Sequence, residues 1–223
     1  MKTNEELQKD VQDAIKFEPL LHAAEIGVTA KDGIVTLSGI VDGYFKKTEA
    51  ENAAKNVSGV KAIVEKITIK YNSTFSKNDN EIAEEAVKAL NDSWVVPNRE
   101  VKVKIENGWV TLSGELSWNY QRQAATKAVN FLMGVTGVTN NIKIKSEVHD
   151  AVEQKDVEAA LARHWSLNAK DIKVKASGTN ITLTGNVTSL YQKEEAEHVA
   201  WNTPGVWSVD NQLEVEYDYS YVD

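Results

Sequence analysis

Hydrophobic and polar residues alternate in two neighbouring segments near the start of the chain. Ile26, Val28 and Ala30 recur at every second position, and the segment GIVTLSG at positions 33–39 continues the alternation. Period-two alternation predicts strands with one buried face. Asp32 and Gly33 lie between the two segments, and an Asp-Gly pair favours the tight type I′ turn of a β-hairpin.

Apolar residues at helical spacing lie on both sides of this hairpin. Leu7, Val11 and Ile15 predict a helix before it, with Thr3 and Glu6 as a capping box. Ala50 and Ala53 belong to a helix after it, and residues 60–69 alternate again as a last strand. The order of elements is therefore helix, strand, strand, helix, strand.

This unit occurs three times. GIVTLSG returns as GWVTLSG at 108–114 and as TNITLTG at 179–185, which gives offsets of 75 and 71 residues. A second glycine follows 20 residues after the last glycine of each segment, in the pairs Gly39 and Gly59, Gly114 and Gly134, and Gly185 and Gly205. We define module 1 as residues 1–71, module 2 as residues 72–146 and module 3 as residues 147–223.

The repeat predicts an α+β fold of three tandem αββαβ modules, each a three-stranded mixed sheet with two helices on one face. Asn107 and Gly108 repeat the type I′ turn, whereas Gly178 and Thr179 suit type II′. We expect the second strands to end at Gly39, Gly114 and Gly185, and the next helices to have Asp42, Ser117 and Thr188 as N-caps. Modules of about 70 residues have small cores, so packing between modules is expected.

The segment Val101 to Gly114 has the pattern V-x-V-x(4)-G-x-V-x-L-x-G and is followed by a helix and a Gly-Val pair. This pattern and the element order resemble the BON domain, a bacterial module named for osmotically inducible and nodulation proteins. The resemblance covers nearly the whole chain, with module 3 the loosest copy. It implies a non-enzymatic module of stress-induced, envelope-associated and transport-associated proteins, for which phospholipid binding has been proposed. One cytoplasmic relative of the family is associated with potassium binding.

Composition narrows the class of protein further. The 223 residues are 42% hydrophobic and 26% charged, include no cysteine and give a net charge of −8. These values are typical of a soluble globular protein without disulfides, thiolate metal sites or a membrane-spanning segment. The charge divides into −1, +1 and −8 for modules 1, 2 and 3. An acidic total disfavours nucleic-acid binding, whereas the nearly neutral modules 1 and 2 remain able to meet a phospholipid surface.

No group of residues predicts catalysis, a cofactor or a metal site. The four histidines, at positions 22, 149, 164 and 198, have no partner at ligand spacing. The glycine pairs lack the Gly-Lys-Ser/Thr of a phosphate-binding loop. We therefore expect no enzymatic activity. The N-terminal residues lack the apolar segment of a secretory signal, which predicts a cytoplasmic protein, or a periplasmic one whose signal has been removed.

The outward face of the module 2 hairpin is the candidate binding surface. Lys102, Lys104, Trp109 and Thr111 share this face by alternation. An exposed tryptophan beside lysines suits a partner or a lipid headgroup. Two other interpretations stay open: a solvated polar sheet face, which we favour on general grounds, and packing of Trp109 against a neighbouring module. Trp94 and Trp165 are a second equivalent pair, seven residues before the first strands of modules 2 and 3.

Two alternative functions are expected. In the first, the modules bind phospholipid or another envelope component, with module 2 as the expected contact. In the second, they respond to potassium in the cytoplasm. Clustered acids near the C-terminus, including Glu214, Glu216 and Asp218, could hold cations weakly. A potassium site built from backbone carbonyls leaves no trace in a sequence.

Overall fold

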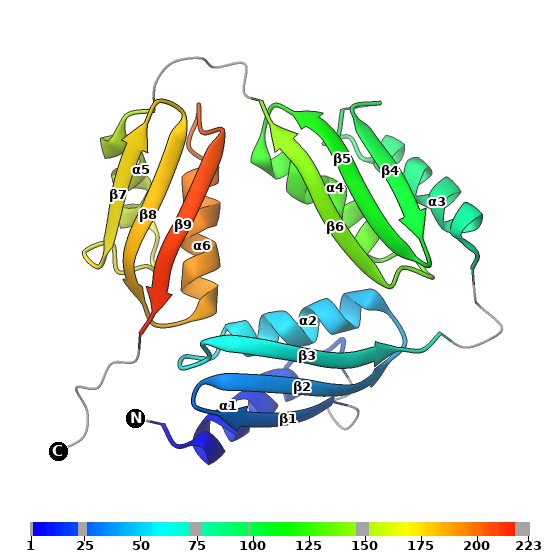
Figure 1. Ribbon diagram of the computed structural model, residues 1–223, viewed down its shortest axis with the longest axis horizontal. Helices are drawn as coiled ribbons and strands as arrows, with labels where there is room; N and C mark the ends of the chain where they lie inside the picture. The colour runs from blue at the N-terminus through cyan, green and yellow to red at the C-terminus, as the bar shows by residue number, and fades with distance from the viewer. Residues whose placement is uncertain (1, 22–25, 72–76, 98, 146–151, 217–223) are drawn as a thin grey trace. The chain divides into compact units, whose positions relative to one another are not determined.

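A computed structural model describes residues 2–21, 26–71, 77–97, 99–145 and 152–216 of the chain. Module 1 contains α1 (Asn4–Lys16), β1 (Ile26–Lys31), β2 (Ile34–Val41), α2 (Tyr44–Lys55) and β3 (Ala62–Ile69). Module 2 contains α3 (Asp79–Asp92), β4 (Val101–Glu106), β5 (Trp109–Leu116), α4 (Asn119–Asn130) and β6 (Gly137–Ile144). Module 3 contains α5 (Gln154–Arg163), β7 (Ile172–Ser177), β8 (Asn180–Val187), α6 (Leu190–Trp201) and β9 (Ser208–Val215). The predicted α+β fold of αββαβ modules is confirmed (Figure 1).

Each module has one three-stranded sheet with the second strand at its centre, in the orders β1-β2-β3, β4-β5-β6 and β7-β8-β9. The hairpin pairs are antiparallel, whereas β5 pairs with β6, and β8 with β9, in parallel. The two helices of a module lie on the same face of its sheet (Figure 1). The opposite face of each sheet carries no helix of its own module. It is the face that the alternation of the strands predicted to point away from the core.

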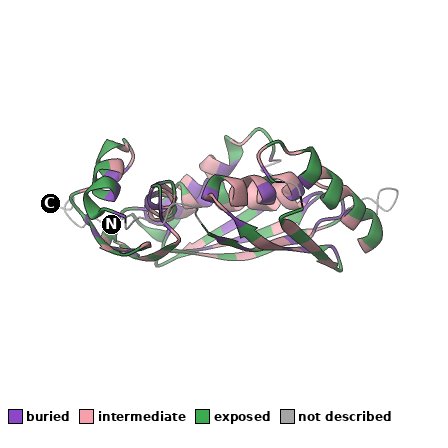
Figure 2. Ribbon diagram, turned by 90° about the horizontal axis from the view of Figure 1, so that it is seen from above, coloured by how far each residue is buried: buried purple, intermediate pink, exposed green. Residues whose placement is uncertain are grey.

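The core of each module lies between its sheet and its helices, where the buried residues gather (Figure 2). In module 2, Val110 and Leu112 of β5 are fully buried, as are Ala125 and Val129 of α4. Small residues on the second helix allow it to approach the sheet closely, as the sequence predicted. In module 3, the buried hydrophobic residues between Val152 and Leu213 form a core cluster of the same kind.

Turn chemistry follows the sequence closely. Asp32 and Gly33 have φ values of 51° and 83°, and Asn107 and Gly108 have 51° and 76°. Positive φ at both positions is the type I′ turn that was predicted. In the hairpin turn of module 3, Gly178 has a positive φ of 62° and Thr179 does not, which agrees with the predicted type II′ turn. The predicted capping box at Thr3–Glu6 is also confirmed, and Asn78–Glu81 forms a second one.

The expected N-caps of the second helices, Asp42, Ser117 and Thr188, were wrong by one residue each. α4 has Trp118 as its N-cap, and α6 has Ser189, whose hydroxyl accepts from the amide of Gln192 at 3.1 Å. α2 begins at Tyr44. In module 3 the preceding residue, Thr188, instead donates from its amide and hydroxyl to the Gln192 side chain, both at 2.9 Å. Thr188 and Ser189 both have hydroxyl groups that can form hydrogen bonds at a helix N-terminus, so the local sequence does not show which of the two is the N-cap.

The prediction that the second strands end at Gly39, Gly114 and Gly185 was also wrong. Each strand continues two residues further, to Val41, Leu116 and Val187. Gly114 has φ of 144°, and a Cβ there would lie 2.1 Å from the backbone oxygen of Glu100. Gly185 has the same relation to Asp171. Glycine is therefore required at these positions because the backbone of the neighbouring segment passes close to them inside the strand; the glycines do not terminate the strand.

Candidate functional site

The predicted surface residues of module 2 do share one face of the sheet. Lys102 pairs with Ser113, Lys104 with Thr111, and Glu106 with Trp109 across the β4–β5 hairpin. The next strand, β6, places Gly137 beside Trp109 and Thr139 beside Thr111. Lys102 and Lys104 are exposed, and Thr111 is half-buried. We call this the module 2 outer face.

Trp109 forms a flat apolar platform at one end of this face. A Cβ on Gly137 would lie 2.4, 2.5 and 2.7 Å from three carbon atoms of the six-membered indole ring. Because these distances are nearly equal, the ring covers Gly137 with its plane and not with its edge. The indole Nε1–H donates to Thr139 Oγ1 at 2.9 Å. The ring is therefore fixed against β6, and 48% of the residue remains exposed.

The lysines of this face lie further along the strands, because the residue paired with Trp109 on β4 is Glu106. Lys104 pairs with Glu106 at 2.9 Å, and Lys145, directly after β6, lies 3.7 Å from Glu115. Lys102 and Lys143 also point outward from the strands, and neither has a carboxylate partner among the residues that the structure describes. Lys102 stands opposite Ser113 and Lys143 opposite Glu115, so the face carries two ammonium groups without an ion pair in the described part of the chain, on the same side of the sheet as the exposed indole, a combination suited to an anionic headgroup.

Module 3 presents a different outer face on the same scaffold. Lys173 and Lys175 are exposed on β7, but Asp210, Glu214 and Glu216 follow one another along the outward side of the last strand and its end. Asn180 stands at the position of Trp109. This face is polar and acidic overall, so it is poorly suited to an anionic surface.

The most exposed aromatic residues lie elsewhere, in the turns that follow the first helix of each module. Trp94 is 95% exposed, Trp165 is 89% exposed and Phe17 is 85% exposed. In modules 2 and 3 the turn is closed by backbone bonds from Val96 to Ser93 at 3.2 Å and from Leu167 to His164 at 3.2 Å. The equivalence of Trp94 and Trp165 was visible in the sequence, but their nearly complete exposure was not.

A polar cluster in module 3 was missed by the sequence reasoning. His164 Nε2 lies 3.0 Å and His198 Nδ1 lies 3.6 Å from the same oxygen of Glu195. The other ring nitrogens contact Ser166 Oγ at 3.0 Å and Asn202 Nδ2 at 3.2 Å. A carboxylate only accepts, so His164 Nε2 donates to Glu195, whereas His198 Nδ1 at 3.6 Å lies beyond hydrogen-bond distance. Each ring nitrogen has a polar neighbour, which makes this cluster a structural network. His22 and His149 lie outside the described residues.

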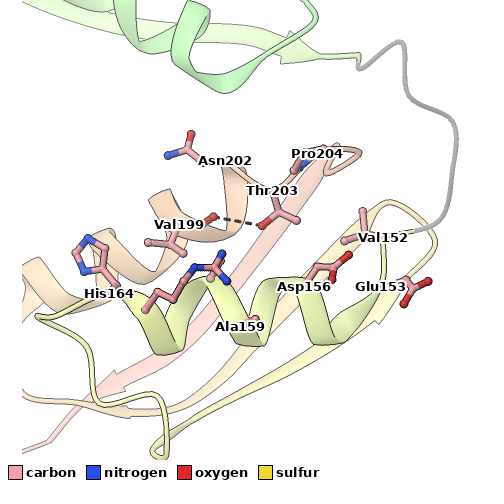
Figure 3. Close-up of a pocket in the computed structure, with 11 residues that line it drawn as sticks. Val152, Glu153, Asp156, Ala159, His164, Val199, Asn202, Thr203 and Pro204 are labelled. Carbon is pink, nitrogen blue, oxygen red and sulfur yellow. Dashed lines mark hydrogen bonds between the residues drawn. The ribbon is translucent and has the colours of Figure 1, made fainter.

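The helical side of module 3 also contains a groove of about 690 Å³ between α5 and α6 (Figure 3). Small side chains, Ala159, Ala160 and Val199, leave this space open. Its ionisable groups do not converge, since His164 and Glu153 lie at opposite ends of the groove (Figure 3). The groove therefore lacks the paired groups that acid–base chemistry needs.

The described ranges contain no group of three or more histidine, aspartate or glutamate side chains placed to hold a metal ion. None of the helices in the described ranges has both the length and the apolar character needed to cross a bilayer. What the three modules share is an uncovered sheet face.

Small α+β modules in tandem, with sheet faces of contrasting charge, define a class of multi-module proteins. A family model for the BON domain matches residues 3–71, 78–146 and 149–217, so the chain belongs to the BON-domain family. Over 140 residues it is 32% identical to osmotically-inducible protein Y of Escherichia coli strain K12, a match that covers 60% of this chain and 69% of that protein.

Two solved structures are also similar, both of CdsD, a structural protein of the type III secretion system of Chlamydia trachomatis. One is 18% identical with a TM-score of 0.26 and covers 95% of this chain and 92% of that one. The other, the C-terminal domain, is 17% identical with a TM-score of 0.26 and covers 97% and 100%. At this TM-score neither structure supports a statement about this chain. The family match supports a stress-related protein of a family not known for enzymes.

Proposed function

We propose that this BON-domain protein is a non-enzymatic stress protein whose modules bind phospholipid or another envelope component, and that the module 2 outer face makes the contact. The observation that carries the proposal is the position of Trp109, held flat against β6 on the same sheet face as Lys102 and Lys143. An indole prefers the boundary between headgroups and acyl chains, and ammonium groups prefer anionic headgroups.

The charge division between modules supports the same assignment. Module 2 is the only module with a positive formal charge, +1, whereas module 3 carries −8. A membrane with a negative surface therefore attracts module 2 and repels module 3. Anionic lipids face both the cytoplasm and the periplasm, so the proposal holds for either location.

Co-sedimentation of the full chain with vesicles tests this function. Vesicles of phosphatidylglycerol and phosphatidylcholine are compared with phosphatidylcholine alone, at low and at high salt. A lysine near an anionic membrane contributes about 1 kcal/mol, and Lys104 is already paired with Glu106, so Lys102→Gln with Lys104→Gln lowers affinity about 5- to 30-fold. The matched control removes the equivalent charges of module 3, Lys173→Gln with Lys175→Gln, and leaves affinity within about twofold of the wild type.

Binding to the anionic vesicles that weakens with salt and depends on the module 2 pair supports the proposal. Absence of binding at low salt overturns it. Equal losses in the two double variants overturn the assignment to module 2, because a general loss of charge then explains the result.

A further inference from the structure

The outer face of module 1 carries the most apolar group of side chains on any of the three sheets. Ile34, Ile40 and Val64 are 47%, 46% and 40% exposed, although each lies in a regular strand. Ile34 and Ile40 come from β2, the centre of the sheet, and Val64 from the neighbouring β3. Thr36 and Ser38, which face the same side, are small. The three aliphatic side chains therefore stand above their surroundings.

The charged side chains on this face are all basic. The outward positions of the three strands include Lys31 of β1 and Lys66 of β3, both exposed, and no aspartate or glutamate. Neither lysine has an ion-pair partner among the residues that the structure describes. Glu65 points to the other side, where it is half-buried and its carboxylate accepts from the amide of Ile67. We call the set Lys31, Ile34, Ile40, Val64 and Lys66 the module 1 outer face.

The other modules show that the fold does not require apolar residues at these positions. Module 3 has Asn180, Asn186 and Asp210 where module 1 has its three aliphatic residues, and Ile181 and Leu183 beneath them are still fully buried. The sheet therefore forms equally well with a polar outer face. Exposed β-branched residues on module 1 need an explanation outside its own core.

We propose that the module 1 outer face enters the headgroup–acyl boundary of an anionic phospholipid bilayer; this inference rests on the proposed function and adds a second contact surface to it. The aliphatic side chains of β2 and β3 are buried among lipid chains, while Lys31 of β1 and Lys66 of β3 reach headgroup phosphates. Charge complementarity selects this occupant, because a face with two unpaired ammonium groups and no carboxylate repels a second copy of itself. A bilayer also needs no pocket for anchor side chains.

The test replaces the aliphatic residues without changing charge. In the full chain, Ile34→Asn, Ile40→Asn and Val64→Thr introduce the residue types of modules 3 and 2 at the same positions. Binding to phosphatidylglycerol-containing vesicles is then expected to fall at least about tenfold, and the loss persists at high salt because it is apolar. Lys31→Gln with Lys66→Gln is expected to cause a loss that disappears at high salt. The reverse change in module 3, Asn180→Ile with Asn186→Ile, gives a gain in binding.

Circular dichroism of each variant establishes that the fold is intact, and light scattering gives the mass of the chain without vesicles. Vesicle affinity equal to that of the wild type in the triple variant overturns this inference, and leaves the proposed function standing if the module 2 variant still loses affinity. A wild-type dimer that the triple variant converts to a monomer, with unchanged vesicle affinity, assigns the face to self-association and also overturns it. No vesicle binding by the wild type overturns both proposals.

Discussion

Replacing Gly137 with alanine tests whether Trp109 is a fixed platform. Gly137 has ordinary backbone angles, so its lack of a side chain serves space and not conformation. The new Cβ would lie 2.4–2.7 Å from three ring carbons, far inside contact distance. The indole must leave β6, and its hydrogen bond to Thr139 Oγ1, 2.9 Å long, is lost with it.

The size of the effect follows from what the ring covers. With Trp109 48% exposed, roughly 100 Å² of the residue is covered, which is worth about 2 kcal/mol at about 25 cal/mol per Å². The lost hydrogen bond adds about 1 kcal/mol. Alanine in a strand recovers about 0.5–1 kcal/mol relative to glycine. The free energy of unfolding of module 2 therefore decreases by about 1–3 kcal/mol.

A double-mutant cycle separates this effect from a general intolerance of alanine. Module 3 has Asn180 and Ser208 at the two positions, so a Cβ fits there when the indole is absent. In a Trp109→Asn background we expect Gly137→Ala to be neutral or stabilising, which gives a coupling energy of about 2 kcal/mol. Urea unfolding of the four proteins, followed by circular dichroism, measures it. An equal cost of Gly137→Ala in both backgrounds would refute the stacked geometry.

Three further predictions concern stability. Gly114→Ala places a Cβ 2.1 Å from the carbonyl oxygen of Glu100 and therefore lowers the free energy of unfolding by about 3 kcal/mol or more. A decrease of less than about 1 kcal/mol, measured by urea unfolding, would contradict the close approach of the Glu100 backbone to Gly114. Asn119 is buried with both amide atoms unpaired among the described residues, so Asn119→Leu stabilises by about 1 kcal/mol or more in thermal unfolding, and a loss would show an unrecognised partner. Burial, and then repulsion from Glu18, raises the pKa of Glu49 above its ordinary value of 4.5. Its ionised form therefore costs stability, so Glu49→Gln raises the melting temperature at neutral pH, and this gain disappears as pH falls below 4.5; a gain that is independent of pH would be inconsistent with this cause.

The features that sequence predicted best depend on adjacent residues. The turns at Asp32-Gly33 and Gly178-Thr179 follow from which residues accept positive φ, and the structure has the predicted turn type at both. The exposure of Trp109 followed from alternation alone, because a residue out of phase with buried neighbours must face away from the core. Three aligned copies made the element order unambiguous.

The features that sequence missed depend on residues far apart in the chain. The carbonyl that requires Gly114 belongs to Glu100, and the glycine under Trp109 is 28 positions later. Glu195 and His198 are three apart on one helix, yet His164 joins them only through the tertiary fold. No local pattern predicts such pairs.

The module 1 outer face was accessible from the sequence but was overlooked. Ile34 occupies the position of Trp109 and has the same phase, so comparison of the three copies predicts its exposure. Lysine and tryptophan residues single out module 2, whereas the apolar residues of module 1 carry no such signal. The potassium-responsive alternative stays a prediction, because carbonyl oxygens leave no mark in the choice of side chains.

Residue-level mapping of the bilayer contact tests the central claim most directly. Amide spectra of the isotope-labelled full chain are recorded with anionic bicelles that carry a paramagnetic lipid. If the outer faces of modules 1 and 2 bind, signals of residues near Ile34, Val64 and Trp109 broaden, while β7, β8 and β9 keep theirs. Broadening confined to module 3, or to the turns at Trp94 and Trp165 with the sheet faces unaffected, would contradict the assignment of binding to the open sheets.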